Sequence, residues 1–179
     1  MKYEFSRQTP EGLLHPFDPV FDARSKALVL GSFPSVKSRE NAFYYGHPQS
    51  RFWPVLAALF SQRIPQTIPE KTEFLHLHHI ALWDMAETCT IKGSADSTLS
   101  LRSVNDIPAL IAKTDVSQVF ANGQLAGRLY KTHAEHLTGL PIRVLPSTSP
   151  ANAAWTLDKL IGGWQPLLEA LRHAGNHPV

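Results

Sequence analysis

KALVLGS, residues 26–32, is a short continuous apolar run that ends in Gly-Ser. Such a run is typical of a strand that is buried on both faces of a parallel sheet. Three later segments, at 80–83, 116–121 and 142–145, are also predicted to be strands. They alternate with stretches of helical length at 52–60, 70–79, 106–113, 124–136 and about 152–173, the last interrupted at 162–163. This alternation predicts an α/β fold with parallel strands and with helices on both faces of the sheet.

Length and composition predict one folded domain. The chain has 179 residues, of which 43% are hydrophobic and 18% charged, which is enough apolar material for a core. Seventeen Lys and Arg against 15 Asp and Glu give a net charge of +2, which permits a polyanionic partner without requiring one. We expect an irregular arm over 1–25 that packs on a domain over 26–173, followed by a tail over 174–179.

The single cysteine, Cys89, excludes an internal disulfide, a four-cysteine iron–sulfur cluster and a Cys-rich zinc site. The N-terminus mixes charges and prolines where a signal peptide needs an apolar run of about 7–15 residues. No stretch approaches the roughly 20 apolar residues that span a bilayer. We therefore expect a cytoplasmic monomer with no membrane association, no metal cluster and no cofactor.

Ligands of parallel sheets bind beyond the carboxyl ends of the strands, because the loops there converge. The first such loop, GSFPSVKSRENAFYYGHPQSRFW, runs from Gly31 to Trp53. Gly31 permits close approach of the backbone to a ligand, and Pro34 stiffens the turn. A planar heteroaromatic ligand, stacked and contacted along its edge, suits the side chains of Tyr44, Tyr45, His47 and Pro48. The alternative is that these rings only cap the core.

The second such segment is VLPSTSPAN, from Val144 to Asn152. Its three hydroxyl groups and its backbone amides stand on a rigid turn between prolines, and such groups bind phosphate oxygens without much net charge. The alternative is an ordinary N-cap, in which one of these hydroxyl groups begins the last helix.

Together these segments resemble motifs of the uracil-DNA glycosylase superfamily, in its mismatch-specific branch and in the related hypoxanthine (deoxyinosine) DNA glycosylases. The long first motif of the family is a Gly-x-x-Pro turn, an aromatic pair, His-Pro and Arg-Phe-Trp. It matches Gly31, Pro34, Tyr44, Tyr45, His47, Pro48 and Arg51-Phe52-Trp53. A strand that leads into Pro-Ser-x-Ser matches 146–149, and Asn-Gly after the third strand matches Asn122-Gly123. The matches follow the family's order over roughly residues 26–160.

The resemblance implies a three-layer α/β/α fold with a four-stranded, mainly parallel sheet, and excision of a damaged base from DNA. The family flips the lesion nucleotide into a pocket and hydrolyses its N-glycosidic bond, while pocket donors stabilise the departing base. By motif position, Tyr45 stacks on the base, and the substrate-binding residues are Gly31, Ser32, Phe33, Tyr45, His47 and Asn122. Pro150 and Ala151 form a wedge in the vacated stack, and the DNA-binding residues are Lys37, Arg51, Ser147, Ser149, Pro150, Ala151 and Asn152.

Two positions depart from the family's pattern. Phe33 stands where the mismatch-specific enzymes have Asn and the strongest uracil enzymes have Asp, and a phenyl ring cannot orient water. Ser50 stands where the family usually has Asn, so Ser50 and the earlier Asn41 are the candidates for holding the catalytic water. Gly-Ser-Phe-Pro-Ser is closer to the hypoxanthine branch, and we predict a monofunctional glycosylase that prefers hypoxanthine to uracil. The alternative is a non-catalytic module that binds lesion DNA or nucleotides.

Other polar groups have an ordinary explanation beside a functional one. The histidines of HLHH, 76–79, suggest metal ligation, but no carboxylate or cysteine completes a recognisable spacing, and solvent-facing rings are the alternative. Lys37 could form a Schiff base with the sugar, as in a lyase, or contact phosphate. Asp84 and Asp96 lie at a strand end and in the next loop, where one could contact the site or cap a turn.

Overall fold

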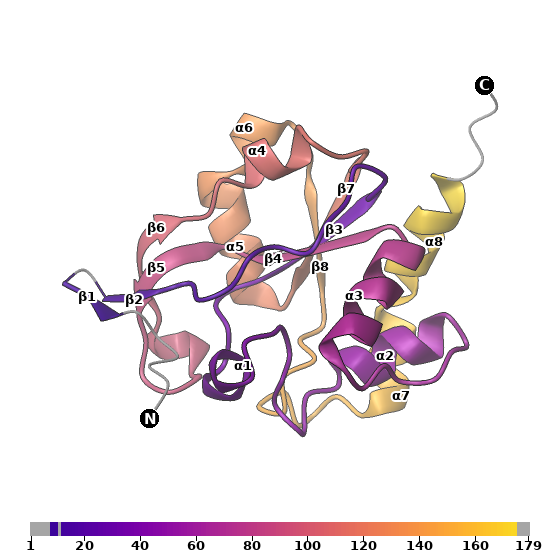
Figure 1. The fold of residues 1–179 in the computed structure, drawn as a ribbon, viewed down its shortest axis with the longest axis horizontal. Helices are drawn as coiled ribbons and strands as arrows, with labels where there is room; N and C mark the ends of the chain where they lie inside the picture. The colour runs from indigo at the N-terminus through magenta and orange to yellow at the C-terminus, as the bar shows by residue number, and fades with distance from the viewer. Residues whose placement is uncertain (1–7, 11, 175–179) are drawn as a thin grey trace.

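The computed structural model of the chain describes residues 8–10 and 12–174. At its centre lies a parallel sheet of four strands in the order β4-β3-β7-β8 (Figure 1). The strands are Ala27–Gly31 (β3), Ile80–Asp84 (β4), Gln118–Asn122 (β7) and Ile142–Leu145 (β8). The four predicted strands are confirmed, and this sheet is parallel throughout. β3 and β4 contain continuous apolar runs because the sheet is covered on both faces.

Helices cover both faces of the parallel sheet (Figure 1). One face carries α2 (Phe52–Leu59), α3 (Ile68–Leu77), α7 (Leu157–Gly163) and α8 (Gln165–His173). The other carries α4 (Ile107–Ile111), α5 (Gln124–His133) and α6 (Glu135–Thr138). Successive residues of β3 enter different cores, since Val29 packs with the first group of helices and Leu28 and Leu30 with the second. This is the three-layer α/β/α fold that the resemblance implies.

The ends of the helices follow from capping and from loop contacts. α3 begins two residues before the predicted start because the Thr67 hydroxyl accepts the Glu70 N–H and the Glu70 carboxylate accepts the Thr67 N–H. The helical stretch predicted over 152–173 is two helices that meet at Trp164, next to the interruption predicted at 162–163. Residues 152–156 are not helical and belong to the loop between β8 and α7.

The chain also forms an antiparallel sheet that the sequence pattern does not predict, in the order β1-β2-β5-β6. Its strands are Gln8–Thr9, Gly12–Leu14, Ala86–Thr90 and Ser100–Val104. The expectation of an irregular arm over 1–25 is therefore wrong where β1 and β2 form. The segments of β5 and β6, AETCT and SLRSV, have no continuous apolar run, and β2 pairs with a strand that lies far along the chain.

Residues beyond β2 continue along the edge of the parallel sheet. The Val20 N–H donates to Leu82 O at 2.9 Å, and the Leu82 N–H donates to Val20 O at 2.8 Å. Of the predicted tail over 174–179, the structure describes Ala174, and the rest lies outside the described residues, so the predicted domain limits stay a prediction. Within 8–10 and 12–174, no helix is both long and apolar enough to cross a membrane.

Candidate active site

The polar segments singled out in the sequence lie at the carboxyl ends of the parallel strands. β3 ends at Gly31, and a turn leads from there into α1 (Val36–Glu40), at the same end of the sheet as the loop between β8 and α7 (Figure 1). The carbonyl groups of Gly31 and Ser32 accept the N–H groups of Met85 and Ala86, at 2.8 and 3.0 Å. The turn is therefore fixed by the backbone that follows β4.

Phe33, the third residue of the turn, places its ring in the core. The ring is 8% exposed and packs with Ala86 and Cys89 in a small apolar cluster. The Arg39 guanidinium lies 5.6 Å from the centroid of the ring. A ligand at this turn therefore meets the backbone of Phe33 rather than its side chain.

The loop between β5 and β6 contacts the same turn. It carries the short helix η1 (Asp96–Thr98), and the Ser32 hydroxyl donates to Asp96 Oδ1 at 2.8 Å. Asp96 is an exposed residue, but desolvation of its carboxyl group raises its pKa; the Ser32 hydrogen bond acts in the opposite direction, and the nearby Asp84 charge adds to the rise. The Val36 N–H donates to Ser94 Oγ at 3.0 Å. The antiparallel sheet thus supports the turn through its connecting loop.

The two tyrosines of the aromatic pair have different surroundings. Tyr44 is 2% exposed and its hydroxyl donates to Asp18 O at 2.9 Å, so it is a core residue. The Tyr45 ring is stacked on the Phe52 ring, with centroids 3.8 Å apart and planes at 18°, and the residue is partly exposed. Its backbone φ of 53° is in the left-handed region, which costs energy for a residue other than glycine. One face of the Tyr45 ring is thus covered by Phe52, while the residue as a whole keeps part of its surface exposed.

The Tyr45 hydroxyl is buried, and the Asn122 side chain lies close enough to act on it by hydrogen bonding, which opposes the rise in its pKa. It is directed at Gly31, where a Cβ atom would lie 3.2 Å from the hydroxyl oxygen. Burial raises the pKa of Tyr45, and the negative charge of Asp84 raises it further. The hydroxyl therefore keeps its proton and can donate it.

Asn122, at the end of β7, is tied to the loop that follows β8. Its amide nitrogen donates to Thr148 Oγ1 at 2.8 Å, and its amide oxygen accepts the Thr148 N–H at 3.0 Å. Thr148 is fully buried. The pair fixes this loop against the end of the parallel sheet.

Arg51 gives its guanidinium group to the same loop. Nη2 donates to the carbonyl groups of Ser149, at 2.6 Å, and Asn152, at 3.0 Å, and Nη1 donates to the carbonyl group of Trp155. Ser149 and Ala151 are exposed beyond these contacts. The guanidinium thus shapes the loop, and the hydroxyl and backbone groups at the loop tip are the ones that face solvent.

A sequence model described as the uracil DNA glycosylase superfamily matches residues 19–168. The chain belongs to this superfamily. It is a DNA glycosylase, an enzyme that hydrolyses the N-glycosyl bond between a base and its sugar, and the alternative of a non-catalytic module is set aside.

Relatives of the glycosylase cover most of its length. A protein of Methanosarcina acetivorans named hypoxanthine DNA glycosylase is 30% identical over 145 residues, which is 80% of this chain and 90% of that protein. A protein of the same name from Methanosarcina barkeri is 28% identical over 150 residues, 83% of this chain and 93% of the relative. The solution NMR structure of a Methanosarcina acetivorans protein, provisionally named a uracil DNA glycosylase, superposes with a TM-score of 0.75 at 28% identity. The superposed region covers 88% of this chain and 97% of the Methanosarcina acetivorans chain.

The two candidates for holding water in the glycosylase make local contacts. Asn41 is exposed, and its amide nitrogen donates to Gly46 O at 2.9 Å, which closes the loop between them. Ser50 is half-buried before α2, and its hydroxyl oxygen accepts the Phe52 N–H at 3.4 Å. Their part in catalysis stays a prediction.

Two more predicted residues, Lys37 and His47, lie in α1 and in the loop between α1 and α2. His47 is half-buried, and its Nδ1 accepts the Gln49 N–H at 3.0 Å, which leaves Nε2 as the donor in the neutral ring. Lys37 is exposed and its Nζ lies 2.7 Å from a carboxylate oxygen of Glu40. Neither contact places these side chains at the turn itself.

His15 and Asp84 form a buried pair at this end of the glycosylase. His15 Nε2 lies 2.8 Å from Asp84 Oδ2, and the two side chains are 4% and 5% exposed. His15 Nδ1 lies 2.8 Å from Phe17 O. The place of Asp84 after a strand made it a candidate in the sequence, whereas no sequence pattern connects residue 15 to residue 84.

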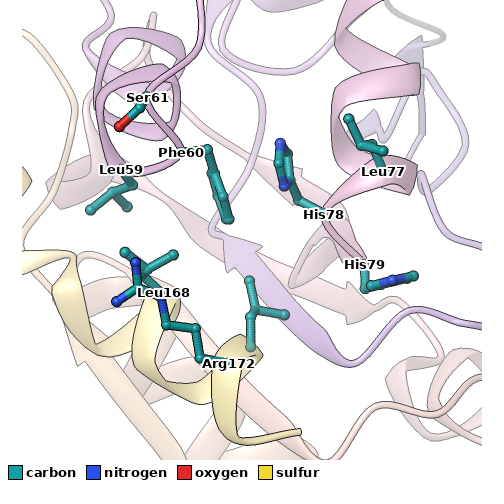
Figure 2. Close-up of a pocket in the computed structure, with 9 residues that line it drawn as sticks. Leu59, Phe60, Ser61, Leu77, His78, His79, Leu168 and Arg172 are labelled. Atoms are coloured by element: carbon teal, nitrogen blue, oxygen red, sulfur yellow. The ribbon is translucent and has the colours of Figure 1, made fainter. Parts of the chain in front are cut away.

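The histidines of HLHH lie away from the active site, where α3 meets the start of β4. Figure 2 shows His78 and His79 beside a cavity of about 350 Å³ between α2, α3 and α8. The His78 ring is stacked on Phe60 at 3.8 Å between centroids, and burial lowers the pKa of His78. Among the described residues, no group of three or more His, Cys, Asp and Glu side chains could hold a metal ion.

Proposed function

We propose that this glycosylase removes hypoxanthine from DNA in preference to uracil and leaves an abasic site. The observation that carries the proposal is the similarity to two proteins named hypoxanthine DNA glycosylase over 80% and 83% of the chain. The turn after β3 supports it, because the Phe33 ring is buried in the core and offers no carboxylate or amide to orient water.

In this proposal the flipped base stacks on the ring of Tyr45, and the backbone amides of Ser32 and Phe33 face its carbonyl oxygen. Negative charge develops on the base as the glycosidic bond breaks, and these donors stabilise it. Ser50 holds the attacking water, since its oxygen accepts the Phe52 N–H and its own proton remains available to donate. Asn41 supports Ser50 by closing the preceding loop at Gly46.

The loop over 147–152 grips the DNA in this proposal. Its exposed hydroxyl and backbone groups, including Ser149, contact phosphate, while Pro150 and Ala151 fill the space that the flipped base leaves. In this proposal hydrolysis proceeds without a Schiff base, because Lys37 is exposed on α1 and none of its contacts brings Nζ to the turn after β3. The expectations of a monomer and of a cytoplasmic location stay predictions.

The test uses duplexes that contain a single hypoxanthine, uracil or xanthine. Abasic sites are scored as strand breaks after alkali, in single turnover with the enzyme in excess. We expect hypoxanthine to be released faster than uracil, with no strand break before alkali and no covalent adduct after borohydride. Faster release of uracil, or no abasic site from any duplex, would overturn the proposal.

A further inference from the structure

Asp84 has one carboxylate oxygen held in place and one directed at the active site. Oδ2 is bound by His15, at 2.8 Å from Nε2. Oδ1 lies over Gly31, its neighbour in the sheet, so closely that a Cβ atom on that residue would be 2.2 Å away. The Tyr45 hydroxyl lies against the same glycine. The absence of a side chain at Gly31 therefore lets the carboxylate oxygen and the Tyr45 hydroxyl approach the same point of the backbone.

The hydrogen bonds of His15 determine which oxygen of Asp84 can accept. Phe17 O is an acceptor, so His15 Nδ1 carries a proton and donates it. The contact between Nε2 and Asp84 Oδ2 then contains one further proton, on the nitrogen or on the oxygen. Oδ1 carries no proton in either arrangement. It is therefore an acceptor, held at a fixed position by a buried pair.

The loss of an amino group changes the pairing edge of a base in one consistent way. The ring nitrogen next to that group, N1 of adenine or N3 of cytosine, has a lone pair in the parent base. In hypoxanthine and uracil the same nitrogen carries a hydrogen and the amino group has become a carbonyl. An acceptor at this position forms a hydrogen bond with the deaminated base and repels the lone pair of the parent base.

We propose that Asp84 Oδ1 accepts the ring N–H that deamination creates, and that Asp84 thereby distinguishes a deaminated base from its parent. This assignment rests on the proposed function. Tyr45, the stacking platform, lies on the same side of Gly31 as Oδ1, which puts the edge of a stacked base beside the carboxylate. Asp84 is thus a specificity-determining residue, and His15 is the positioning residue that orients it.

The test compares two duplexes that bind without being cleaved, because the lesion nucleotide carries a 2′-fluoroarabino sugar. One has hypoxanthine, and the other has unsubstituted purine, whose N1 has a lone pair. We expect the wild-type protein to bind the hypoxanthine duplex about 10- to 100-fold more tightly. In Asp84→Ala this ratio falls about tenfold but stays above one, because hypoxanthine keeps its carbonyl contact and unsubstituted purine has no carbonyl. The two duplexes differ in the base carbonyl for the wild-type protein and for Asp84→Ala alike. The change in ratio between the two proteins therefore reports the N–H alone.

Further variants separate recognition from folding. Asp84→Ser keeps an oxygen near His15 but is too short to reach the base. If Asp84→Ala shows no cooperative melting, Asp84→Ser replaces it, and the same fall in the ratio of the two affinities is expected. In Asp84→Asn, neutral His15 accepts the amide N–H and turns the amide oxygen to the base, so the preference is retained. Asp96→Asn, beside the same turn, leaves the ratio at its wild-type value.

Each outcome decides the assignment. The role of Asp84 would be overturned if the wild-type protein bound the two duplexes equally well. It would also be overturned if folded Asp84→Ala or Asp84→Ser had the same ratio as the wild-type protein. A ratio that falls as far in Asp84→Asn as in Asp84→Ala would overturn the orienting role of His15. Failure of the proposed function is recognised separately, in the alkali assay, because the present measurement involves no release of base.

Discussion

Asn122 and Thr148 form a closed pair of hydrogen bonds, amide nitrogen to hydroxyl at 2.8 Å and backbone N–H to amide oxygen at 3.0 Å. The pair joins the end of β7 to the loop between β8 and α7. The motifs of the sequence predict separate roles for the two segments, since Asn122 is expected to contact the base and the loop over 147–152 the phosphates. Because the side chains are bonded to each other, displacement of either segment disturbs the other.

Asn122→Ala removes both bonds and leaves the N–H and hydroxyl groups of fully buried Thr148 without partners. We expect the free energy of unfolding to fall by about 1–3 kcal/mol, the cost of unsatisfied buried polar groups. Urea denaturation measures it. Asn122→Asp is the matched control, because a carboxylate can accept from both the N–H and the hydroxyl group. Equal losses in the two variants would contradict the role of this pair.

Tyr45→Ala should weaken binding to DNA that contains hypoxanthine by about 1–3 kcal/mol, because the base loses its stacking surface. Tyr45→Phe keeps the ring on Phe52 and removes only a buried hydroxyl group, whose polar neighbour is the Asn122 side chain and not the base. Its affinity should therefore stay close to that of the wild-type protein. The dissociation constants, measured at one salt concentration, decide whether the ring or the hydroxyl group binds the base.

The parallel sheet could be predicted because burial on both faces leaves a mark in the sequence. β3 is apolar at every position before Gly31, and the structure buries all five of its residues. β5 follows β4 after a single residue, Met85, and its sequence AETCT mixes buried and exposed positions, with a register shift between Thr88 and Cys89, so it has no such run. Its pairing with β2 depends on contacts between distant segments, and local patterns do not contain that information.

The order of the motifs along the sequence predicts which segments form the site. The order placed Asn122 at the end of a strand and Tyr45 in the long segment after the first strand, and the structure has Asn122 at the end of β7 and Tyr45 in the loop between α1 and α2. It could not show that the Arg51 guanidinium is used by three backbone carbonyl groups, because loop conformation decides where a long side chain points. It also could not find His15, which reaches Asp84 only through the path of the N-terminal segment.

Arg51→Ala should lower stability without changing how binding to DNA depends on salt. The guanidinium shapes the loop instead of neutralising a phosphate, so the slope of log affinity against log salt should match that of the wild-type protein. Lys37→Ala is the comparison, and a phosphate contact there should reduce the slope by about one. A reduced slope in Arg51→Ala would show that the guanidinium leaves the loop to bind phosphate.

Cys89 should make stability fall at high pH. Burial raises the pKa of the Cys89 thiol to about 11, against an ordinary 9.0, while the Arg39 charge acts in the opposite direction. As the pH rises, the unfolded chain loses the thiol proton first, so the thiol's contribution is present below pH 9 and is lost towards pH 11. The difference in unfolding free energy between the wild-type protein and Cys89→Ala should therefore shrink over this range. Urea denaturation at about pH 8 and about pH 10.5 tests it, and a constant difference would contradict the buried thiol.

Gly31→Ala should be the most harmful of the small substitutions at the turn. Its Cβ atom would lie 2.2 Å from Asp84 Oδ1 and 3.2 Å from the Tyr45 hydroxyl oxygen. We expect a loss of about 1–3 kcal/mol in unfolding free energy, since overpacking must displace the buried carboxylate. Gly162→Ala is the matched control, because no atom lies within 4 Å of its Cβ position in α7. That variant should gain up to about 1 kcal/mol from helix propensity.

The source of the loss in Gly31→Ala can be assigned with a second substitution. If the collision is with the carboxylate, Asp84→Ala in the Gly31→Ala background removes it, and the double variant should be more stable than the sum of the single losses allows. Independent effects would add, as they do for residues that do not touch. Additive losses would therefore place the strain elsewhere in the turn, and a coupling of about 1 kcal/mol or more would show that the space at Gly31 exists for Asp84.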